Sequence, residues 1–572
     1  MEPLVIVLAA ALAVLIFALP RIRSRLMLSR AKHRSLGGHA RVAKRLARLI
    51  PYYEFHGPGF FNSDGAPDTI ASERRAGFRR LASLFRERNT KSIAMGERLA
   101  ESVSDLQFTR RYRIPFQYSR HIRERLQPGA FVTESSGVML TDLDGNESYD
   151  LTGSYGVNLL GNDFYKDCID AGIAKVRDLG PVLGSYHPLV EDNVQKLRAI
   201  SGLDEVSFHM SGTEAVMQAV RLARYHTRRS HVVRFCGAYH GWWDGVQPGI
   251  GNPGNIGDVY TLKDMDERTL KVLRNRRDIA CVLVNPLQAL HPNSNAPADS
   301  MLVNSARATS FDRAAYAEWL RKLRQVCDER GIVLILDEVF VGFRIAYRGA
   351  QEYFGVRADL VTYGKTLGGG LPVGVVCGKR HLMKRFRDDR PLDICFARGT
   401  FNSHPYVMAA MHEFLCRIGQ AEMQQRLYEN LDARWDNRAQ LVNERLSAAA
   451  LPVRVANFST IFTVLYTRPS RYNWMFQFYL RAEGLSLSWV GTGRLIFSLD
   501  YSDQDFAQIT ERFVRAGQRM QTDQWWWHDT SITNRSISRQ VLKEMVKSRL
   551  FGGDSVRNEA NADADPTRTR AS

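Results

Sequence analysis

Short runs of uninterrupted apolar residues alternate with longer helical patterns through the middle of this chain. The run Ile332–Leu336 has no polar residue, so both faces of the strand that it predicts must be buried. Comparable runs occur at Glu205–His209, Val232–Phe235, Cys281–Val284 and Leu360–Tyr363. Strands separated by helices predict an α/β fold with a mostly parallel sheet wrapped by helices.

Composition and charge narrow the class of protein. The 572 residues are 44% hydrophobic, which fits a folded chain of two or three lobes and excludes a multi-span membrane protein. Half of the net charge of +18 lies in residues 1–50, which predicts a local partner and no nucleic-acid surface. The seven cysteines form no C-x-x-C pair and no His cluster has metal-ligand spacing, so we expect reduced thiols and no metal site.

The N-terminus predicts a membrane anchor. Leu4–Leu19 is uninterrupted apolar sequence of roughly 25 Å as a helix, the short end of what spans a bilayer. Arginines follow Pro20, so we expect a single-pass anchor with the large domain in the cytoplasm, at a bacterial inner membrane. A buried helix or an uncleaved signal is the alternative. Residues 41–50 predict a basic amphipathic helix that contacts lipid headgroups or packs on its own protein.

Changes in composition suggest the domain boundaries. We expect the anchor at 1–20, a basic amphipathic and connecting region at 21–107 with a helix near Thr69–Arg88, the first part of a small domain at 108–150, a large ligand-binding domain at 151–393, the rest of the small domain at 394–552, and a disordered tail at 553–572.

Residues that can hold a ligand follow the predicted strands, where the carboxyl ends of parallel strands meet. Ser211, Gly212 and Thr213 lie between a strand and a helical pattern, which together predict a phosphate cradle. The next strand is followed by Tyr239 in a glycine-flanked turn. Each of these features is weak alone, because capped helices and packed aromatics are common.

Two further strand ends carry an acid and a lysine. Asp337 follows a fully buried strand, where a carboxylate needs a cation, and Lys365 stands in a glycine-rich turn. A nucleotide-binding P-loop is excluded because Asp359 occupies the position of its first glycine. Pyridoxal phosphate uses a phosphate cradle, a stacking aromatic, an acid and a lysine together.

Five motifs resemble the signature of the class III aminotransferases, in the family's order and within residues 108–520. They are Ser211–Ala215, Tyr239–Gly241, Asp337–Arg344, Tyr363–Gly374 and Gly399–Pro405. Glutamate-1-semialdehyde aminomutases share them. The aminotransferase domains of polyketide and peptide assembly lines look closer still, on the segments Tyr112–Gln117, Leu151–Asn158 and Pro286–Gln288. The resemblance implies a fold-type I pyridoxal-phosphate transferase with a large domain, a smaller α+β domain and a homodimer.

The resemblance also implies roles for individual residues. Lys365 would form the Schiff base and carry the proton, Asp337 would pair with the ring nitrogen, and Tyr239 would stack on the ring. The phosphate would be bound by Ser211, Gly212 and Thr213, and by Thr400 of the neighbouring subunit. Gln288 would lie near the ring hydroxyl, Ser154 and Tyr155 would line the substrate side, and Arg344 would bind substrate or be structural.

These features predict a membrane-anchored aminotransferase. It would move an amino group from an amino acid to an aldehyde or keto-acyl carbonyl on an amphiphilic acceptor or an acyl carrier protein. The alternative is a glutamate-1-semialdehyde-type 2,1-aminomutase, which is an isomerase, and a more remote alternative is an inactive tethered scaffold. Asn285 stands where the family often has a glutamate that gates substrate recognition, which leaves the amino donor open.

Overall fold

The computed structural model describes residues 2–33, 38–112, 114–129, 131–254, 257–286, 312–488 and 494–551. Two compact units make up the chain. Unit 1 comprises Met1–Ala47, Cys168–Leu290 and Phe311–Tyr428, and unit 2 comprises Arg48–Asp167, His291–Ser310 and Glu429–Ser572. Gln288 and the predicted disordered tail at 553–572 lie outside the described residues.

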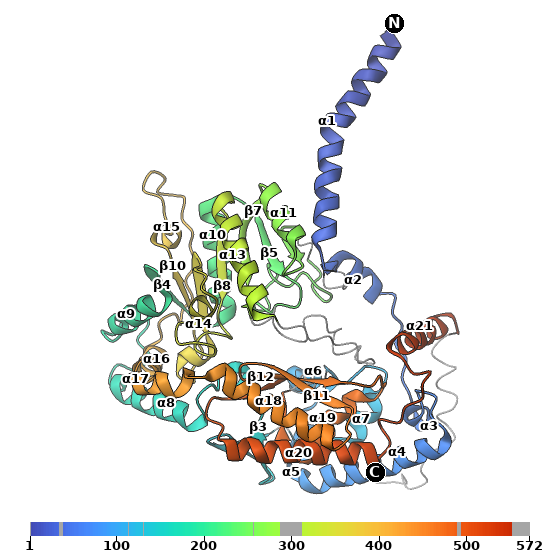
Figure 1. Ribbon diagram of the computed structural model, residues 1–572. Coiled ribbons are helices and arrows are strands. Elements are labelled where there is room, and N and C mark those ends of the chain that lie inside the picture. The colour runs from blue at the N-terminus through green and yellow to red at the C-terminus, as the bar shows by residue number, and fades with distance from the viewer. Residues whose placement is uncertain are drawn as a thin grey trace. The chain divides into compact units, whose positions relative to one another are not determined.

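Unit 1 is built on a seven-stranded sheet in the order β4-β10-β9-β8-β7-β5-β6 (Figure 1). Its strands are β4 (Glu205–His209), β5 (His231–Phe235), β6 (Val259–Leu262), β7 (Ile279–Val284), β8 (Val333–Asp337), β9 (Leu360–Gly364) and β10 (Gly374–Gly378). Strands β6, β5, β7, β8 and β9 are parallel, whereas β10 is antiparallel to both β9 and β4. The α/β fold is confirmed, with a mixed sheet, and the five predicted strands are present.

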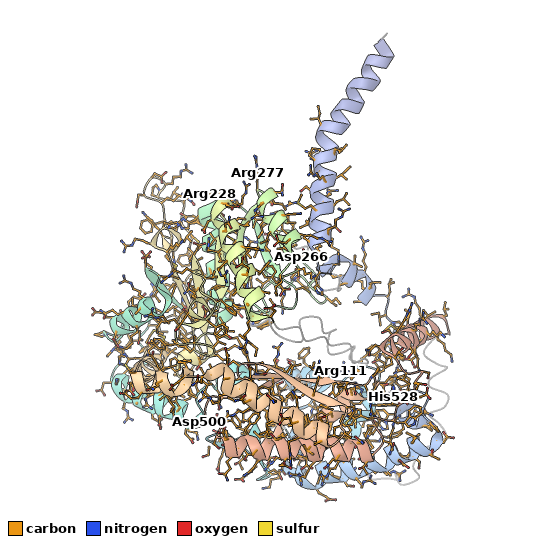
Figure 2. All side chains as sticks on the ribbon, viewed as in Figure 1. Arg111, Arg228, Asp266, Arg277, Asp500 and His528 are labelled. Carbon is orange, nitrogen blue, oxygen red and sulfur yellow. The ribbon has the colours of Figure 1, made fainter. Side chains whose placement is uncertain are left out.

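Helix α10 (Gly212–Thr227) packs across β7 to β10. Its small residues Ala215, Ala219 and Ala223 are fully buried, so the helix can lie close to the sheet. The other helices of this unit are α2 (Ala40–Ala47), α9 (Val190–Ser201), α11 (Glu267–Asn275), α13 (Arg313–Arg330), α14 (Gly349–Phe354), the 3₁₀ turn η4 (Lys365–Gly368), α15 (Arg380–Met383), α16 (Pro405–Ile418) and α17 (Ala421–Tyr428). Charged side chains mark helix ends at the surface, such as Arg228 after α10 and Asp266 before α11 (Figure 2).

The expected membrane anchor over residues 1–20 is wrong. Within the described residues, no helix is both long and apolar enough to cross a bilayer. The predicted single-pass topology and inner-membrane location, which depend on the anchor, are therefore wrong as well. The apolar run Leu4–Leu19 supplies only 16 residues, fewer than the ~20 that a bilayer requires. Helix α1 (Glu2–Ala31) continues past Pro20 into the arginine-bearing segment.

The C-terminal part of α1 is attached to the sheet edge of unit 1. It lies against α11 (Figure 1). Next to α11, Arg276 donates to Oγ of Ser24 at 3.3 Å. The amide of Lys263, next to the edge strand β6, donates to the carbonyl of Ala31 at 2.9 Å. The predicted amphipathic helix forms as α2, and its Lys44 donates to the carbonyl of Gly254 at 2.9 Å. This contact supports the alternative in which α2 packs on its own protein.

Unit 2 combines segments from both ends of the chain. A four-stranded sheet has the order β1-β2-β3-β13, and a three-stranded antiparallel sheet has the order β11-β12-β14. The strands are β1 (Val132–Ser136), β2 (Met139–Asp142), β3 (Glu147–Asp150), β11 (Val453–Phe458), β12 (Ile461–Tyr466), β13 (Leu485–Ser486) and β14 (Arg494–Ile496). The helices are α3 (Gly57–Phe61), α4 (Asp68–Arg88), α5 (Thr90–Leu99), α6 (Ser104–Tyr112), α7 (Ser119–Arg125), η2 (Gly153–Gly156), α18 (Leu431–Ala448), η5 (Asn473–Met475), α19 (Phe476–Ala482), α20 (Asp503–Thr522) and α21 (Asn534–Phe551), while α8 (Asn162–Val176) crosses the boundary. The helix predicted near Thr69–Arg88 is confirmed as α4.

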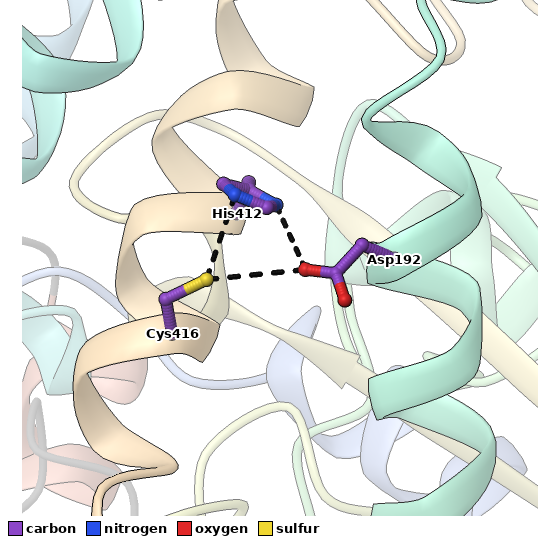
Figure 3. Close-up of side chains that lie close together, drawn as sticks. All are labelled: Asp192, His412 and Cys416. Carbon is purple, nitrogen blue, oxygen red and sulfur yellow. Dashed lines mark hydrogen bonds and ion pairs between the residues drawn. The ribbon is translucent and has the colours of Figure 1, made fainter.

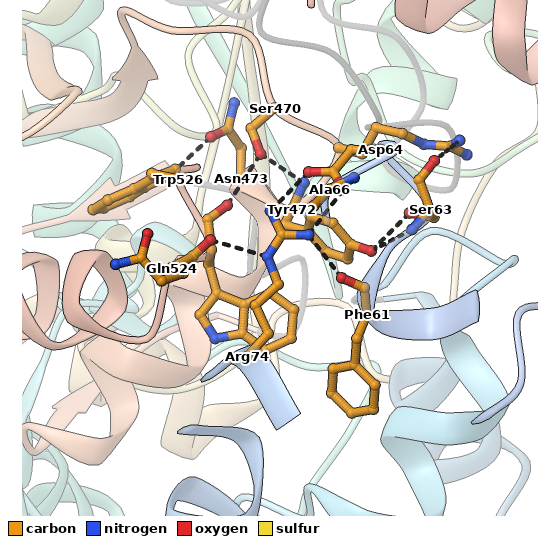
Figure 4. A network of polar contacts seen from close by, with 12 residues as sticks. Phe61, Ser63, Asp64, Ala66, Arg74, Ser470, Tyr472, Asn473, Gln524 and Trp526 are labelled. Carbon is orange, nitrogen blue, oxygen red and sulfur yellow. Dashed lines mark hydrogen bonds and ion pairs between the residues drawn. The ribbon is translucent and has the colours of Figure 1, made fainter. Parts of the chain in front are cut away.

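A buried polar network joins the N-terminal and C-terminal segments of unit 2 (Figure 4). Arg74 of α4 is fully buried and pairs with Asp64 at 2.7 Å. It also donates to the carbonyls of Phe61 at 2.7 Å and Gln524 at 2.9 Å, and its guanidinium lies 4.5 Å from the ring centroid of Tyr472. Because a buried guanidinium needs all of these partners, the network fixes α4 against the C-terminal segment.

Arg74→Met is expected to lower the free energy of unfolding by about 3–5 kcal/mol, because Asp64 would be left buried without its cation. Chemical denaturation measures the change. The matched control is Arg79→Met, an exposed position on the same helix, which should stay within about 0.5 kcal/mol of the parent. Adding Asp64→Asn to Arg74→Met should recover part of the loss, and a purely additive double mutant would contradict the pairing.

Candidate active site

A buried carboxylate lies at the carboxyl end of β8. Asp337 is 2% exposed, and its Oδ2 lies 2.7 Å from Nδ1 of His240. Its Oδ1 accepts hydrogen bonds from the Thr362 hydroxyl and the Val339 amide, both at 3.2 Å. Burial lowers the pKa of His240, while the carboxylate opposes that shift. Nε2 of His240 is buried and makes no hydrogen bond with any described residue. The pair therefore presents an acid held in place by an imidazole.

Lys365 lies at the same edge of the sheet, one strand away. Asp337 pairs with Thr362 across β8 and β9, and Lys365 follows three residues later, directly after β9. Its backbone takes a left-handed conformation, with φ of +51°. Its Nζ lies 4.5 Å from the ring centroid of Phe340, which follows β8. The sheet thus places Asp337 and Lys365 at neighbouring strand ends.

The predicted anion cradle falls at the N-terminus of α10. Ser211 caps the helix by accepting the amide of Glu214 at 3.2 Å, while the amides of Gly212 and Thr213 come first in the helix and have no intrahelical acceptor. Gly241 has φ of +88°, and a Cβ there would lie 2.5 Å from Oγ1 of Thr213. Only glycine allows the turn after Tyr239 to approach the helix this closely.

Tyr239 and Asn285 meet beside this cradle. Tyr239 is 58% exposed, so its ring can contact a ligand, and partial desolvation together with the charge of Asp337 raises its pKa. Asn285 follows β7, and its side-chain amide lies 3.5 Å from the carbonyl of Tyr239. Oδ1 of Asn285 is buried and has no hydrogen-bond partner among the described residues. The residue that replaces the family's glutamate therefore sits next to the aromatic that is expected to stack.

Arg344 is fully buried. Its guanidinium carbon lies 5.3 Å from the centroid of Phe340, the ring that Lys365 also contacts. This position favours a structural role over direct contact with a substrate. Its neighbour in the same motif, Glu338, is also buried, and burial raises its pKa to about 8 while its carboxyl accepts the amide of Ala350 at 2.7 Å.

The remaining predicted residues lie elsewhere. Thr400 is exposed in the loop that precedes α16. Ser154 and Tyr155 belong to unit 2, where both take left-handed backbone conformations in η2, with φ of +45° and +57°. Such backbone strain is characteristic of functional turns. The roles of these three residues remain predictions.

Sequence reasoning gave no role to His240 or Thr362, although both contact Asp337. The sequence does contain a signal for His240, which lies inside the motif Tyr239–Gly241. A buried acid requires a partner, and a histidine near the end of a strand is a candidate for that partner. Thr362 could not be found in this way, because its contact depends on the register between β8 and β9.

The residues present fit pyridoxal phosphate. Two amides at a helix start, which have no intrahelical acceptor, suit a phosphate. A buried carboxylate suits a protonated ring nitrogen, and an amine-bearing residue follows the neighbouring strand. Glycines at 212 and 241 keep the cradle open, since a Cβ at Gly212 would lie 2.6 Å from Cγ1 of Val339.

His240→Phe is expected to lower kcat by about 10- to 100-fold, because Asp337 would lose a charge-assisted hydrogen bond worth about 1.5–3 kcal/mol. His240→Gln, which can still donate, should retain more activity. Titration of the bound cofactor's absorbance separates positioning from simple loss of packing, because only the former shifts the pH profile. Identical profiles for both variants and the parent would refute a role through Asp337.

Comparisons with known proteins agree with this geometry. The sequence profile described as aminotransferase class-III matches residues 121–516. The glutamate-1-semialdehyde 2,1-aminomutase of Alkaliphilus oremlandii (strain OhILAs) is 34% identical over 319 residues, covering 53% of this chain and 69% of the relative. That of Nitratidesulfovibrio vulgaris (strain DP4) is 33% identical over 343 residues, covering 59% and 77%. A solved transaminase with bound pyridoxal phosphate has a TM-score of 0.61 at 25% identity, covering 76% of this chain and 98% of that one.

Proposed function

Because the chain belongs to the class-III aminotransferase family of pyridoxal-phosphate enzymes, we propose that it moves an amino group from an amino-acid donor to the aldehyde or keto-acyl carbonyl of a second substrate. The observation that carries the proposal is the meeting of Asp337, Lys365 and the α10 cradle at one sheet edge. An inactive scaffold has no need for this arrangement.

Each of these groups has a task in amino transfer. The bound cofactor supplies an electron sink for the negative charge that develops on the substrate carbon. Asp337, oriented by His240, keeps a proton on the ring nitrogen. Lys365 binds the cofactor through its amine and moves the proton at the substrate carbon. The amides of Gly212 and Thr213 bind the phosphate, and Tyr239 covers the ring.

The nature of the acceptor is the finer part of the proposal. The expectation of an amphiphilic acceptor rested on the membrane anchor, and it is withdrawn with that anchor. The likeness of Leu151–Asn158 to assembly-line aminotransferase domains supports a carbonyl presented by an acyl carrier protein. The test measures kcat/KM for the free and the carrier-bound form of one keto-acyl substrate. We expect a clearly higher kcat/KM for the carrier-bound form. Equal values would contradict the proposal that the acceptor is presented by an acyl carrier protein.

The second candidate is a 2,1-aminomutase, which the names of the similar relatives favour. A donor panel separates the two functions. Holoenzyme is mixed with single amino acids, and the loss of the visible cofactor band and the release of a keto acid are measured. Transfer requires at least one donor that gives both signals. Isomerisation of glutamate-1-semialdehyde, with no keto acid released from any donor, would replace our proposal by the aminomutase.

We further propose a homodimer in which Thr400 completes the phosphate site of the partner subunit. Its exposed position in the loop before α16 supports this. Hybrid dimers of Lys365→Ala and Thr400→Asp protomers provide the test. If the site is shared, one of the two sites in each hybrid keeps both native residues, so activity should rise above that of either parent variant. No rise would place Thr400 in its own protomer's site or outside it, and light scattering checks the dimer itself.

A further inference from the structure

Outside the active site, three side chains that commonly bind metals meet between helices α9 and α16 of unit 1 (Figure 3). His412 and Cys416 are one turn apart on α16, and Asp192 projects from α9. Sγ of Cys416 lies 3.5 Å from Nε2 of His412 and 3.9 Å from Oδ2 of Asp192. Nδ1 of His412 lies 3.2 Å from the same carboxylate oxygen.

The spacing of these atoms suits a single small ion. One ligand atom from each residue can be chosen so that all three lie within 4.8 Å of one another. Around a tetrahedral zinc ion, with bonds of about 2.0–2.3 Å, ligand atoms stand about 3.3–3.7 Å apart, so only small side-chain adjustments are needed. Nδ1 of His412 is also buried, and although it lies 3.2 Å from Oδ2 of Asp192 it makes no hydrogen bond of good geometry with any described residue.

We propose that Asp192, His412 and Cys416 form a Zn²⁺ site, with a water molecule as the fourth ligand. A thiolate, an imidazole and a carboxylate are the ligands that zinc takes in proteins. Binding requires that the thiol of Cys416 give its proton to solvent, so one Zn–S bond forms as one S–H bond breaks. No oxidation or reduction is involved.

One residue competes with the metal. Nζ of Lys196, one turn after Asp192 on α9, lies 2.6 Å from each carboxylate oxygen of Asp192. The lysine side chain is 31% exposed, so its ammonium can turn into water when a cation takes its place. A second ammonium, that of Lys175, is already occupied by Glu413 at 2.5 Å. Lys196 therefore sets how tightly the site binds zinc.

Occupation of the site would link α9 to α16, the helix that packs against the turn of Lys365. Asn193 of α9 donates to the carbonyl of Met408 in α16 at 2.9 Å. Helix α16 in turn packs against η4, which begins at Lys365, and a Cβ at Gly369 would lie 2.3 Å from the carbonyl of Ala410. Zinc would thus act as a clamp behind the active site, without contact with the substrate.

The test uses the holoenzyme and Co²⁺ as a spectroscopic substitute for Zn²⁺. Tetrahedral Co²⁺ with a thiolate ligand absorbs in the red part of the visible spectrum, where pyridoxal phosphate does not. We expect one equivalent of Co²⁺ to give this band and Zn²⁺ to remove it. Cys416→Ser and His412→Ala should each weaken binding at least ~10-fold. Cys236→Ala, at another partly exposed cysteine, should bind as the parent does.

Lys196→Met is the discriminating variant, because it frees Asp192 while all three ligands remain. Its affinity for Zn²⁺, measured by competition against Co²⁺, should be higher than that of the parent. The cofactor's visible absorbance confirms that each variant is folded. Metal uptake that is unchanged in both Cys416→Ser and His412→Ala, or an affinity that does not rise in Lys196→Met, would overturn the proposal.

Discussion

Lys365→Ala is expected to reduce amino transfer by at least ~10⁴-fold, the upper range of what a single acid–base group contributes, because the same amine also binds the cofactor covalently. The visible band of the Schiff base should disappear with it. The fold should persist, because alanine and lysine have similar backbone strain at the φ of +51° found at this position. Single-turnover kinetics with a donor amino acid measure the loss, and thermal unfolding checks the fold.

Borohydride reduction followed by peptide mapping identifies the reacting lysine independently of activity. The matched control is Lys263→Ala, because Lys263 also follows a parallel strand of this sheet, β6, and is exposed. That variant should keep both the label on Lys365 and the rate. A label on any lysine other than 365 would defeat the assignment.

Asp337→Asn is expected to lower kcat/KM by between about 10²- and 10⁴-fold while the cofactor stays bound. A neutral amide cannot pair with a protonated ring nitrogen, and the loss of a buried charge partner costs about 3–5 kcal/mol. The volume of the side chain is unchanged, and the new Oδ1 can still accept from His240 or Thr362. Steady-state kinetics on cofactor-saturated enzyme isolate the electrostatic effect from cofactor binding.

Asp359→Asn is the control for this prediction. Asp359 is also a buried aspartate of the same sheet, but it precedes β9 and pairs with Arg324 at 2.9 Å and Lys379 at 2.6 Å, at the opposite edge from the site. Its replacement should reduce stability and leave kcat of the folded enzyme close to that of the parent. Wild-type turnover in Asp337→Asn would mean that another acid serves the ring.

Much of the central sheet could be predicted because buried strands have a strong signal. The runs that form β4, β5, β7, β8 and β9 are visible in the sequence, whereas the sequence does not predict β6 and β10. Strand β6 is a four-residue edge strand with a tyrosine and a threonine, and β10 lies between Gly374 and Gly378, residues that usually mark turns. Strand β10 runs antiparallel to β9, and no local sequence pattern shows this direction, because it depends on the path of the connection between the two strands.

The candidate site was predictable to the same extent. Asp337 ends a strand, Lys365 and Ser211–Thr213 come just after strand ends, and parallel topology brings such positions to one edge of the sheet. The contact with Thr362 and the zinc site depend on cross-strand register and on packing between helices α9 and α16, respectively. The predicted membrane anchor is wrong because the helix continues beyond Pro20 and attaches to β6 and α11, which the hydropathy of Leu4–Leu19 does not show.

The network around Arg74 also determines when unit 2 can be completed during synthesis. Ser63 bonds to the hydroxyl of Tyr472, 409 residues further along the chain. At about 5–20 residues per second, the N-terminal half of this unit waits roughly 20–80 s on the ribosome for its partner strands and helices. During that interval Phe60 and Phe61, which are buried in the finished protein, lack their ring contacts with Trp525 of the C-terminal segment. We therefore expect this chain to depend on chaperones that hold its first 150 residues until the last helices emerge.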